Sequence, residues 1–217
     1  MRNAVIFSLL LSSLFLAGCA TSRDVITLDT SDLKATTATS SNGKTVFINT
    51  VVDERVFEAN PQEPATPSLD PSESDTPDIR AHAIARKRNG FGKALGDILL
   101  APNTSIPDLV TLGLTNALTE KGYTVLTKKE DVTAETYLVD VKVKKFWSWM
   151  NPGAFAITLS TEISTDMVMK NGANKPLVDK NITIKESDNF QTGMTENWIA
   201  VMKKAVRTYS AEVSKNL

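Results

Sequence analysis

The strongest structural signal in the sequence is Tyr137-Leu-Val-Asp-Val-Lys-Val-Lys144, where tyrosine or valine occupies every second position and mostly charged residues fall between them. Successive side chains of a β-strand point to opposite faces of its sheet, so this pattern predicts a strand with one buried face. We expect the same parity to continue through Trp147 and Trp149, up to the turn signal Asn151-Pro152-Gly153.

Two further segments extend this strand into an antiparallel unit. Apolar side chains alternate with polar ones from residue 155 to 169, and Asn171-Gly172 then supplies a second turn. Residues 177–186 repeat the alternation, with Ile182 and Ile184 in step. The sequence therefore predicts three consecutive antiparallel strands joined by short turns.

Upstream segments add strands with weaker signals. Residues 45–52 are rich in β-branched and aromatic side chains and are short enough to form a buried strand that begins the sheet. The early half of residues 79–88 fits a strand or a short helix, and we favour the strand. Residues 123–126 are also predicted to be a strand.

Two amphipathic helices complete the pattern. Ser105 and Asp108 have the spacing of a capping pair, and Gly122 fits the left-handed position that ends a helix. A second helix is predicted to begin with Thr195 as its cap and to run toward the C-terminus. Apolar residues recur in both at three- and four-residue spacing. We therefore expect an α+β fold, with an antiparallel sheet and two main helices packed on one face.

The N-terminus carries an export signal. The apolar run from residue 4 to 17 is too short to span a membrane, and small residues precede Cys19. The tetrapeptide Leu16-Ala17-Gly18-Cys19 resembles the lipobox of bacterial lipoproteins, which implies signal cleavage between Gly18 and Cys19 and lipidation of Cys19. The alternative is an ordinary secretory signal with a chance cysteine.

Acyl chains on Cys19 would anchor the mature protein, and two or three chains hold firmly where a single chain does not. Because no aspartate follows Cys19, the likeness to sorted lipoproteins implies the outer membrane. We expect a lipid-anchored, periplasm-facing protein. Cys19 is also the lone cysteine, so no intramolecular disulfide can form and the fold must rest on packing.

Composition limits the partners and the number of domains. The chain has 25 acidic and 24 basic residues, and this balance argues against a nucleic-acid partner. About 200 mature residues suffice for one core. We divide the chain into a signal peptide (1–18), a lipidated cysteine with a flexible tether (19–44), and a single α+β domain (45–217).

Residues 53–78 interrupt the domain's strand pattern. Five prolines fall there among a run of acidic residues, and we predict a long mobile loop. This acidic, proline-rich loop is either a solvated insertion or a partner-binding segment that folds on contact.

Six residues are candidates for a partner-binding surface. They are the cations Arg86, Lys87, Arg88 and Lys93 and the tryptophans Trp147 and Trp149. The cations could meet lipid head groups, glycan-linked acids or an acidic protein face, or simply lie in a solvated loop. The tryptophans either pack under one end of the sheet or form a binding surface for a protein, glycan or lipid.

Signals for catalysis are weak. His82 is the lone histidine, and we interpret it as incidental rather than as a catalytic base. Neither a second histidine nor a cysteine cluster supplies zinc ligands, and the carboxylates show no distinctive acid–base pair. We therefore expect no catalytic residue, no metal and no cofactor, and we do not expect an enzyme.

The order of features resembles one known family. The chain is similar to YajG-type outer-membrane lipoproteins over most of residues 45–217. The shared features, in order, are the lipobox, the polar tether, a strand, the capped helix, Lys121-Gly122-Tyr123-Thr124-Val125, three antiparallel strands and the closing helix. This resemblance implies a periplasm-facing envelope lipoprotein and carries over no catalytic residues.

The leading hypothesis is a non-enzymatic binding or accessory lipoprotein that supports a cell-envelope assembly through a protein partner. Two alternatives stay open. One is a structural lipoprotein that contacts peptidoglycan, and the other is an enzyme that acts on glycan or lipid through carboxylates.

Overall fold

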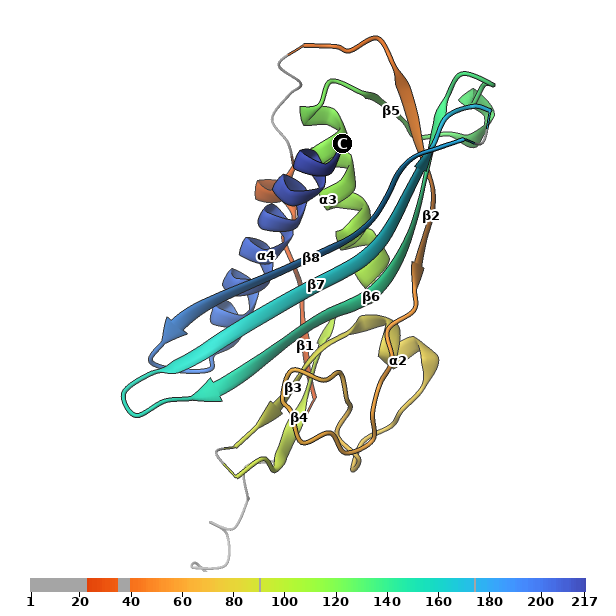
Figure 1. The fold of residues 1–217 in the computed structure, drawn as a ribbon. Helices are drawn as coiled ribbons and strands as arrows, with labels where there is room; N and C mark the ends of the chain where they lie inside the picture. Colours follow the sequence, from red (N-terminus) through yellow and green to blue (C-terminus); the bar gives the residue numbers. More distant parts are fainter. Residues whose placement is uncertain (1–22, 35–39, 90, 174) are drawn as a thin grey trace, which may run out of the picture.

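The computed structural model describes residues 23–34, 40–89, 91–173 and 175–217 as an α+β fold (Figure 1). The predicted signal peptide, its cleavage site after Gly18 and the lipidation site Cys19 lie outside the described residues. Within these ranges, eight strands form one mixed sheet, and two long helices pack against it. Among the described residues, no helix is long and apolar enough to cross a membrane.

Three long strands form the antiparallel unit that the alternation predicts. They are β6 (Tyr137–Pro152), β7 (Ile157–Lys170) and β8 (Pro176–Phe190). β7 pairs along almost its whole length with β6 on one side and with β8 on the other. This part of the fold is confirmed.

The prediction of an antiparallel sheet is only partly correct, because the other edge of β6 is paired with parallel strands. The first half of that edge pairs with β2 (Thr45–Asp53), and the second half meets β3 (Ala83–Arg88). The remaining strands are β1 (Asp24–Ile26), parallel to β4 (Ala94–Leu100), which is antiparallel to β3, and β5 (Thr124–Leu126), parallel to β2. Long connections allow this parallel pairing, whereas the alternation within a strand does not encode its direction.

The two helices are α3 (Ile106–Glu120) and α4 (Thr195–Asn216), which pack side by side on one face of the sheet (Figure 1). Ser105 and Asp108 form the capping box that begins α3, and Gly122 adopts a φ of 80° just after it. The cap of α4 is Met194 rather than the predicted Thr195.

The main core lies between the helices and the sheet. Tyr209 of α4 is fully buried there, and its hydroxyl lies 3.0 Å from that of Thr165 in β7. Burial raises the pKa of Tyr209 to about 12. Gly113 of α3 lies so close to the ring of Tyr209 that an added Cβ would come within 2.9 Å of it. This glycine therefore lets the two helices approach each other.

The described part of the predicted tether is folded, which corrects that prediction. Asp24–Ile26 forms β1 at the edge of the sheet, and Leu28 and Leu33 are buried in the main core. These apolar side chains are too few to signal an element by periodicity, but the sheet edge and α4 supply a surface for them to cover. Residues 23–34 therefore belong to the domain.

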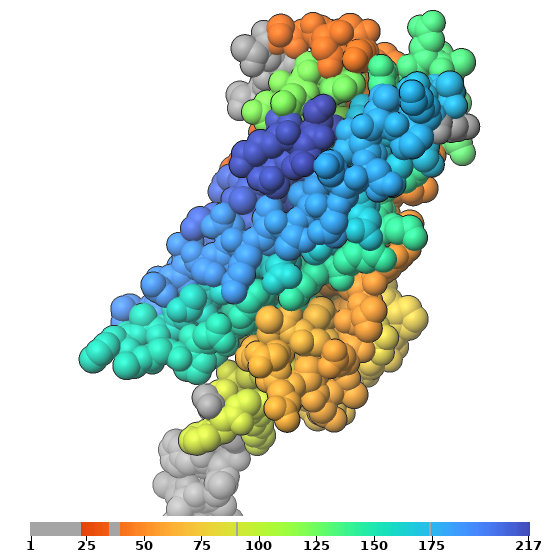
Figure 2. Space-filling view, viewed as in Figure 1, coloured from red at the N-terminus to blue at the C-terminus, as the bar shows by residue number. Residues whose placement is uncertain are grey.

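The acidic, proline-rich loop is also folded, so the prediction of a long mobile loop is wrong. Residues 54–76, here called the strap, pack on the face of the sheet opposite the helices (Figures 1 and 2). α2 (Pro77–His82) follows the strap, where a strand was predicted, and leads into β3. Thr76 caps α2 by accepting a hydrogen bond from the backbone N–H of Ile79.

A β-bulge after Val143 reverses the faces of β6. Val143 pairs with Thr165, but Lys145 pairs with Ser164, so one residue of β6 is extra. Beyond this bulge Phe146 faces the main core, and Trp147 and Trp149 face the strap. The expectation that both tryptophans lie on the face of Val143 is therefore wrong, because an inserted residue shifts a period of two by one.

Candidate binding site on the strap

Arg55 fixes the start of the strap to the sheet. Its Nη1 donates to the backbone oxygens of Ala83 (2.7 Å) and Phe146 (3.0 Å). Its Nη2 donates to the carbonyl oxygen of Arg80 (2.6 Å) and to Asp53 Oδ2 (2.8 Å). The side chain is fully buried. One guanidinium group therefore ties β2, β3, α2 and β6 together.

Arg86 and Arg88 hold the middle of the strap. Arg88 Nη1 donates to the carbonyl oxygen of Pro61 (2.9 Å), and both arginines donate to the hydroxyl of Ser68, at 3.4 and 3.2 Å. Burial and the neighbouring charge of Arg86 lower the pKa of Arg88. These two cations lie under the strap rather than on the protein surface.

A second, smaller core lies under the strap. Trp147 is fully buried, donates from Nε1 to the carbonyl oxygen of Pro64 (3.2 Å), and packs edge-on against Phe57 with ring centroids 5.8 Å apart. Trp149 is 4% exposed, and the ammonium groups of Lys145 and Lys185 lie over its ring. Of the two interpretations of the tryptophans, the structure therefore shows core packing.

A buried carboxylate connects the strap to β1 and β4. Asp97 Oδ1 accepts from the backbone N–H of Asp70 (2.8 Å), and its Oδ2 accepts from Arg23 Nη2 (2.8 Å). Arg23 also pairs with Glu73 of the strap (2.9 Å). Burial raises the pKa of Asp97, although Arg23 and the N–H of Asp70 oppose that shift.

Asp70 closes the same network from the strap side. Its Oδ1 accepts from the N–H and hydroxyl of Ser72, and its Oδ2 accepts from the N–H of Gly96 (3.0 Å). Burial opposes its ionisation, but these hydrogen bonds and the charge of Arg86 hold the pKa of Asp70 below its usual value. The strap is therefore held in one shape by charged and polar contacts.

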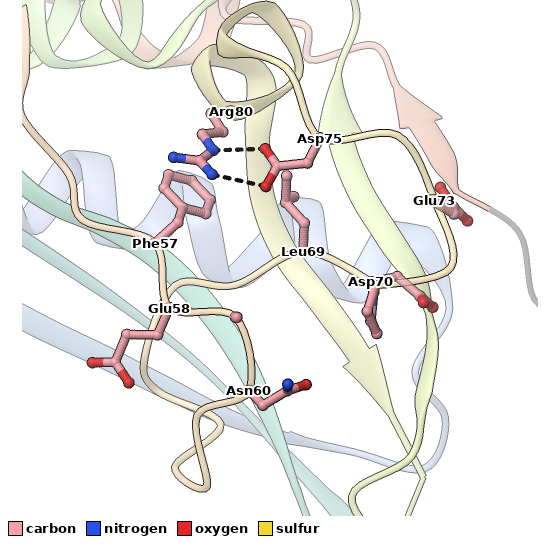
Figure 3. Close-up of a pocket in the computed structure, with 10 residues that line it drawn as sticks. Phe57, Glu58, Asn60, Leu69, Asp70, Glu73, Asp75 and Arg80 are labelled. Atoms are coloured by element: carbon pink, nitrogen blue, oxygen red, sulfur yellow. Dashed lines mark hydrogen bonds and ion pairs between the residues drawn. The ribbon is translucent and has the colours of Figure 1, made fainter.

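The fixed strap leaves a recess of about 330 Å³ on its outer side (Figure 3). Four acidic residues and a single basic residue, Arg80, are among its lining. The ten lining residues are Phe57, Glu58, Ala59, Asn60, Leu69, Asp70, Pro71, Glu73, Asp75 and Arg80. Leu69 and Phe57 give the recess an apolar floor next to these charged residues.

Some charges of the recess are already paired. Arg80 makes two contacts with Asp75, from Nε at 2.6 Å and from Nη2 at 2.8 Å, and this pairing lowers the pKa of Asp75 (Figure 3). Glu58 is exposed and points away from that pair in the figure. Glu73 is paired as well, with Arg23 at 2.9 Å, and Asp70 is buried among its hydrogen bonds. The recess therefore presents the negative charge of Glu58 beside an apolar floor.

The six sequence candidates do not form one surface. Arg86, Arg88, Trp147 and Trp149 are buried, which rules them out as an exposed contact face. Lys87 is half-buried and pairs with Asp24 at 2.8 Å. Lys93 is exposed on the turn between β3 and β4.

His82 does not take part in the recess. It lies on α2 with Nδ1 2.8 Å from the carbonyl oxygen of Asp78. Within the described ranges, no group of three or more histidine, cysteine, aspartate or glutamate side chains could hold a metal ion.

Sequence reasoning missed Arg55, Asp97 and the recess itself. A usable signal existed for Asp97, because a lone carboxylate inside the apolar stretch 94–100 implies a buried charge that needs a partner. Glu58 and Asn60 lie in a stretch without periodicity, so nothing in their spacing predicts that they share a recess with Arg80.

Comparison with known proteins gives structural neighbours only. No family model matches the chain, and no curated protein sequence matches it. A Xanthomonas campestris protein described under DUF330 is similar in structure, with a TM-score of 0.48, 10% identity, and coverage of 87% of this chain and 91% of that one. A minor lipoprotein from Acinetobacter baumannii has a TM-score of 0.36 and 11% identity, and covers 52% of this chain and 87% of its own.

Proposed function

We propose that this protein is a lipid-anchored, periplasm-facing binding lipoprotein of the outer membrane, without catalytic activity, that holds an envelope protein at the recess of the strap. The lipobox at Cys19 supports the anchor, and the resemblance of the chain to envelope lipoproteins supports the compartment. The observation that supports the binding role is that side chains of the protein itself hold the strap in one shape.

A strap that is fixed in advance binds at lower entropic cost. Loop ordering is one of the main costs of association, and here Arg55, Arg88 and Asp97 order the segment without a partner. The recess therefore has the properties of a site that is formed before its ligand arrives.

The charges of the recess define its partner. The exposed carboxylate of Glu58 on its rim favours a segment that carries lysine or arginine, and the floor formed by Phe57 and Leu69 favours an apolar side chain next to that charge. We propose a basic, partly apolar segment of an envelope protein as the ligand.

The same composition supports a non-enzymatic role. The lining residues include no histidine, serine, cysteine or lysine, and the carboxylates Asp70 and Asp75 are held ionised by their hydrogen bonds and ion pairs. A general acid–base pair needs one carboxyl group with a raised pKa that reaches the substrate. Asp97 has a raised pKa, but it lies beneath the strap with no exposed side-chain surface.

In-cell photo-crosslinking tests the proposal. A photoreactive amino acid at Glu58 or Asn60, both exposed on the recess, is expected to give a discrete protein product, and the same group at Lys180 on β8 is not. Glu58→Lys, combined with the photoreactive group at Asn60, should weaken the product because it reverses a rim charge.

The matched control for charge is Glu130→Lys, which makes the same reversal on an exposed residue far from the strap. Equal yields from the two charge reversals would contradict the electrostatic argument. No protein product from Glu58 and Asn60, together with co-sedimentation of the protein with purified peptidoglycan, would replace the proposal by the structural alternative.

A further inference from the structure

Three connections of the fold lie at one end of the sheet: β3–β4, β6–β7 and β8–α4. β3 and β6 run parallel, with Ala85 opposite Ser148, so the β3–β4 turn and the β6–β7 turn leave the sheet at the same end. β8 also ends there, because Ile157 at the start of β7 pairs with Phe190. Figure 1 shows the first two turns toward the lower left, away from the β7–β8 turn at the upper right.

This end carries exposed apolar side chains that the fold does not use. Phe91 on the β3–β4 turn is 98% exposed, and Phe155 on the β6–β7 turn is 94% exposed. Met194, between β8 and α4, is 60% exposed. Among the described residues, the two phenylalanines are the aromatic residues with large exposure, and both are at this end. Phe91, Phe155 and Met194 are here called the apolar tips.

The chain from the anchor arrives at the same end. β1 is parallel to β4 with Asp24 opposite Ile98, so Arg23, the first described residue, lies on the side of β1 that faces the start of β4. Four residue steps separate Cys19 from Arg23, which span at most about 14 Å. A lipid anchor on Cys19 would therefore lie within that distance of Arg23, which is at the edge of the sheet beside β4.

We propose that the apolar tips rest in the interfacial layer of the phospholipid bilayer that holds the anchor, so that the domain has a fixed orientation on the membrane. The proposal rests on the lipid anchor of the proposed function. Aromatic side chains are favoured at the membrane interface, where an apolar ring can enter the acyl boundary. Lys93, exposed on the same turn as Phe91, can meet lipid phosphates.

The orientation has a consequence for the recess. The strap lies on the face of the sheet opposite the helices, and the apolar tips lie at one end of the sheet. A membrane at the tips therefore meets the sheet at its end and leaves the strap's face open to the periplasm.

Site-specific fluorescence on the mature, lipidated protein tests the orientation. Because acylation consumes the thiol of Cys19, the variants Phe91→Cys, Phe155→Cys and Leu177→Cys each provide one labelling site. Leu177 is the matched control, since it is half-exposed beside the β7–β8 turn at the opposite end. Each variant is labelled with nitrobenzoxadiazole and placed in vesicles of phosphatidylethanolamine and phosphatidylglycerol.

The expected result is a blue shift of the emission from positions 91 and 155, and loss of that emission when lipids carry a nitroxide at the headgroup level. Position 177 should show neither change. Emission at 91 and 155 that matches position 177 would overturn the proposal. A failed anchor is read separately, because the wild-type protein would then take up label at Cys19 and stay out of the vesicles.

Discussion

Asp97 joins three segments through one carboxylate, and its surroundings make its ionisation a measurable part of stability. It accepts the N–H of Asp70 and pairs with Arg23. Removing one partner of a buried ion pair leaves the charge of the other partner uncompensated. Asp97→Ala should therefore lower the free energy of unfolding by about 3 kcal/mol.

The pH dependence of this group has a definite sign. Burial raises the pKa of Asp97 above its ordinary 3.8. Between 3.8 and this raised pKa, the folded state therefore binds more protons than the unfolded state. The free energy of unfolding of the wild type, relative to that of Asp97→Asn, should therefore fall as the pH rises from 3.8 through the raised pKa of Asp97. Urea unfolding of both proteins over a pH series measures the difference, and a difference that does not change with pH would contradict this assignment.

Trp147 gives a second test on a single side chain. It is fully buried against Phe57 and donates to the carbonyl oxygen of Pro64, so Trp147→Ala should cost about 4 kcal/mol through the cavity it creates. Trp147→Phe keeps much of the volume and should lose less. Thermal unfolding measures both variants. An unchanged melting transition for Trp147→Ala, accompanied by loss of partner capture, would instead indicate a surface role.

Among the elements, the strap depends most on hydrogen bonds from side chains of other elements. Arg88 donates to Pro61 and Ser68, so Arg88→Met should keep the packing of the side-chain stem but release the middle of the strap. The wild type is expected to resist a glutamate-specific protease, whereas Arg88→Met should be cut after Glu58 or Glu63. Mass spectrometry of the fragments identifies the site.

A matched variant for that experiment is Arg207→Met, which removes an exposed arginine that pairs with Asp32 on the helix side. Cleavage of the strap at equal rates in the wild type, Arg88→Met and Arg207→Met would show that Arg88 does not hold it.

The elements that the sequence predicts well are those whose signal is local. The alternation from Tyr137, the capping box of Ser105 and Asp108, and the stop at Gly122 all depend on neighbours in the chain. The strap was missed because its stability comes from side chains far away in the sequence, such as Arg88 and Trp147.

The bulge shows how one residue limits such predictions. Nothing in the alternation of β6 marks the position after Val143 as extra, yet that insertion moves Trp147 from the predicted face to the other. The candidate surface failed for a different reason, because the strap, a segment far away in the sequence, covers Arg86 and Arg88, which look like solvated cations in the sequence.

For the protein as a whole, the anchor makes a prediction independent of the recess. Cells that are fed an alkyne-bearing fatty acid should label the wild type at Cys19 and should not label Cys19→Ala, because the chain has no other cysteine. Gel fluorescence after coupling to a dye measures the incorporation. Equal labelling of the two proteins would contradict lipidation at this position.

The pairing of β1 has a mechanical consequence. A pull on the proposed lipid anchor would enter the domain through the three register pairs between β1 and β4, whereas β7 shares fourteen register pairs with β6. Arg23, at the start of this load path, holds Asp97 and Glu73. Tension between membrane and partner is therefore expected to loosen the strap before it breaks the main core, which single-molecule pulling from Cys19 would record as a small first extension. The recess would release its ligand under load while the rest of the protein stays folded.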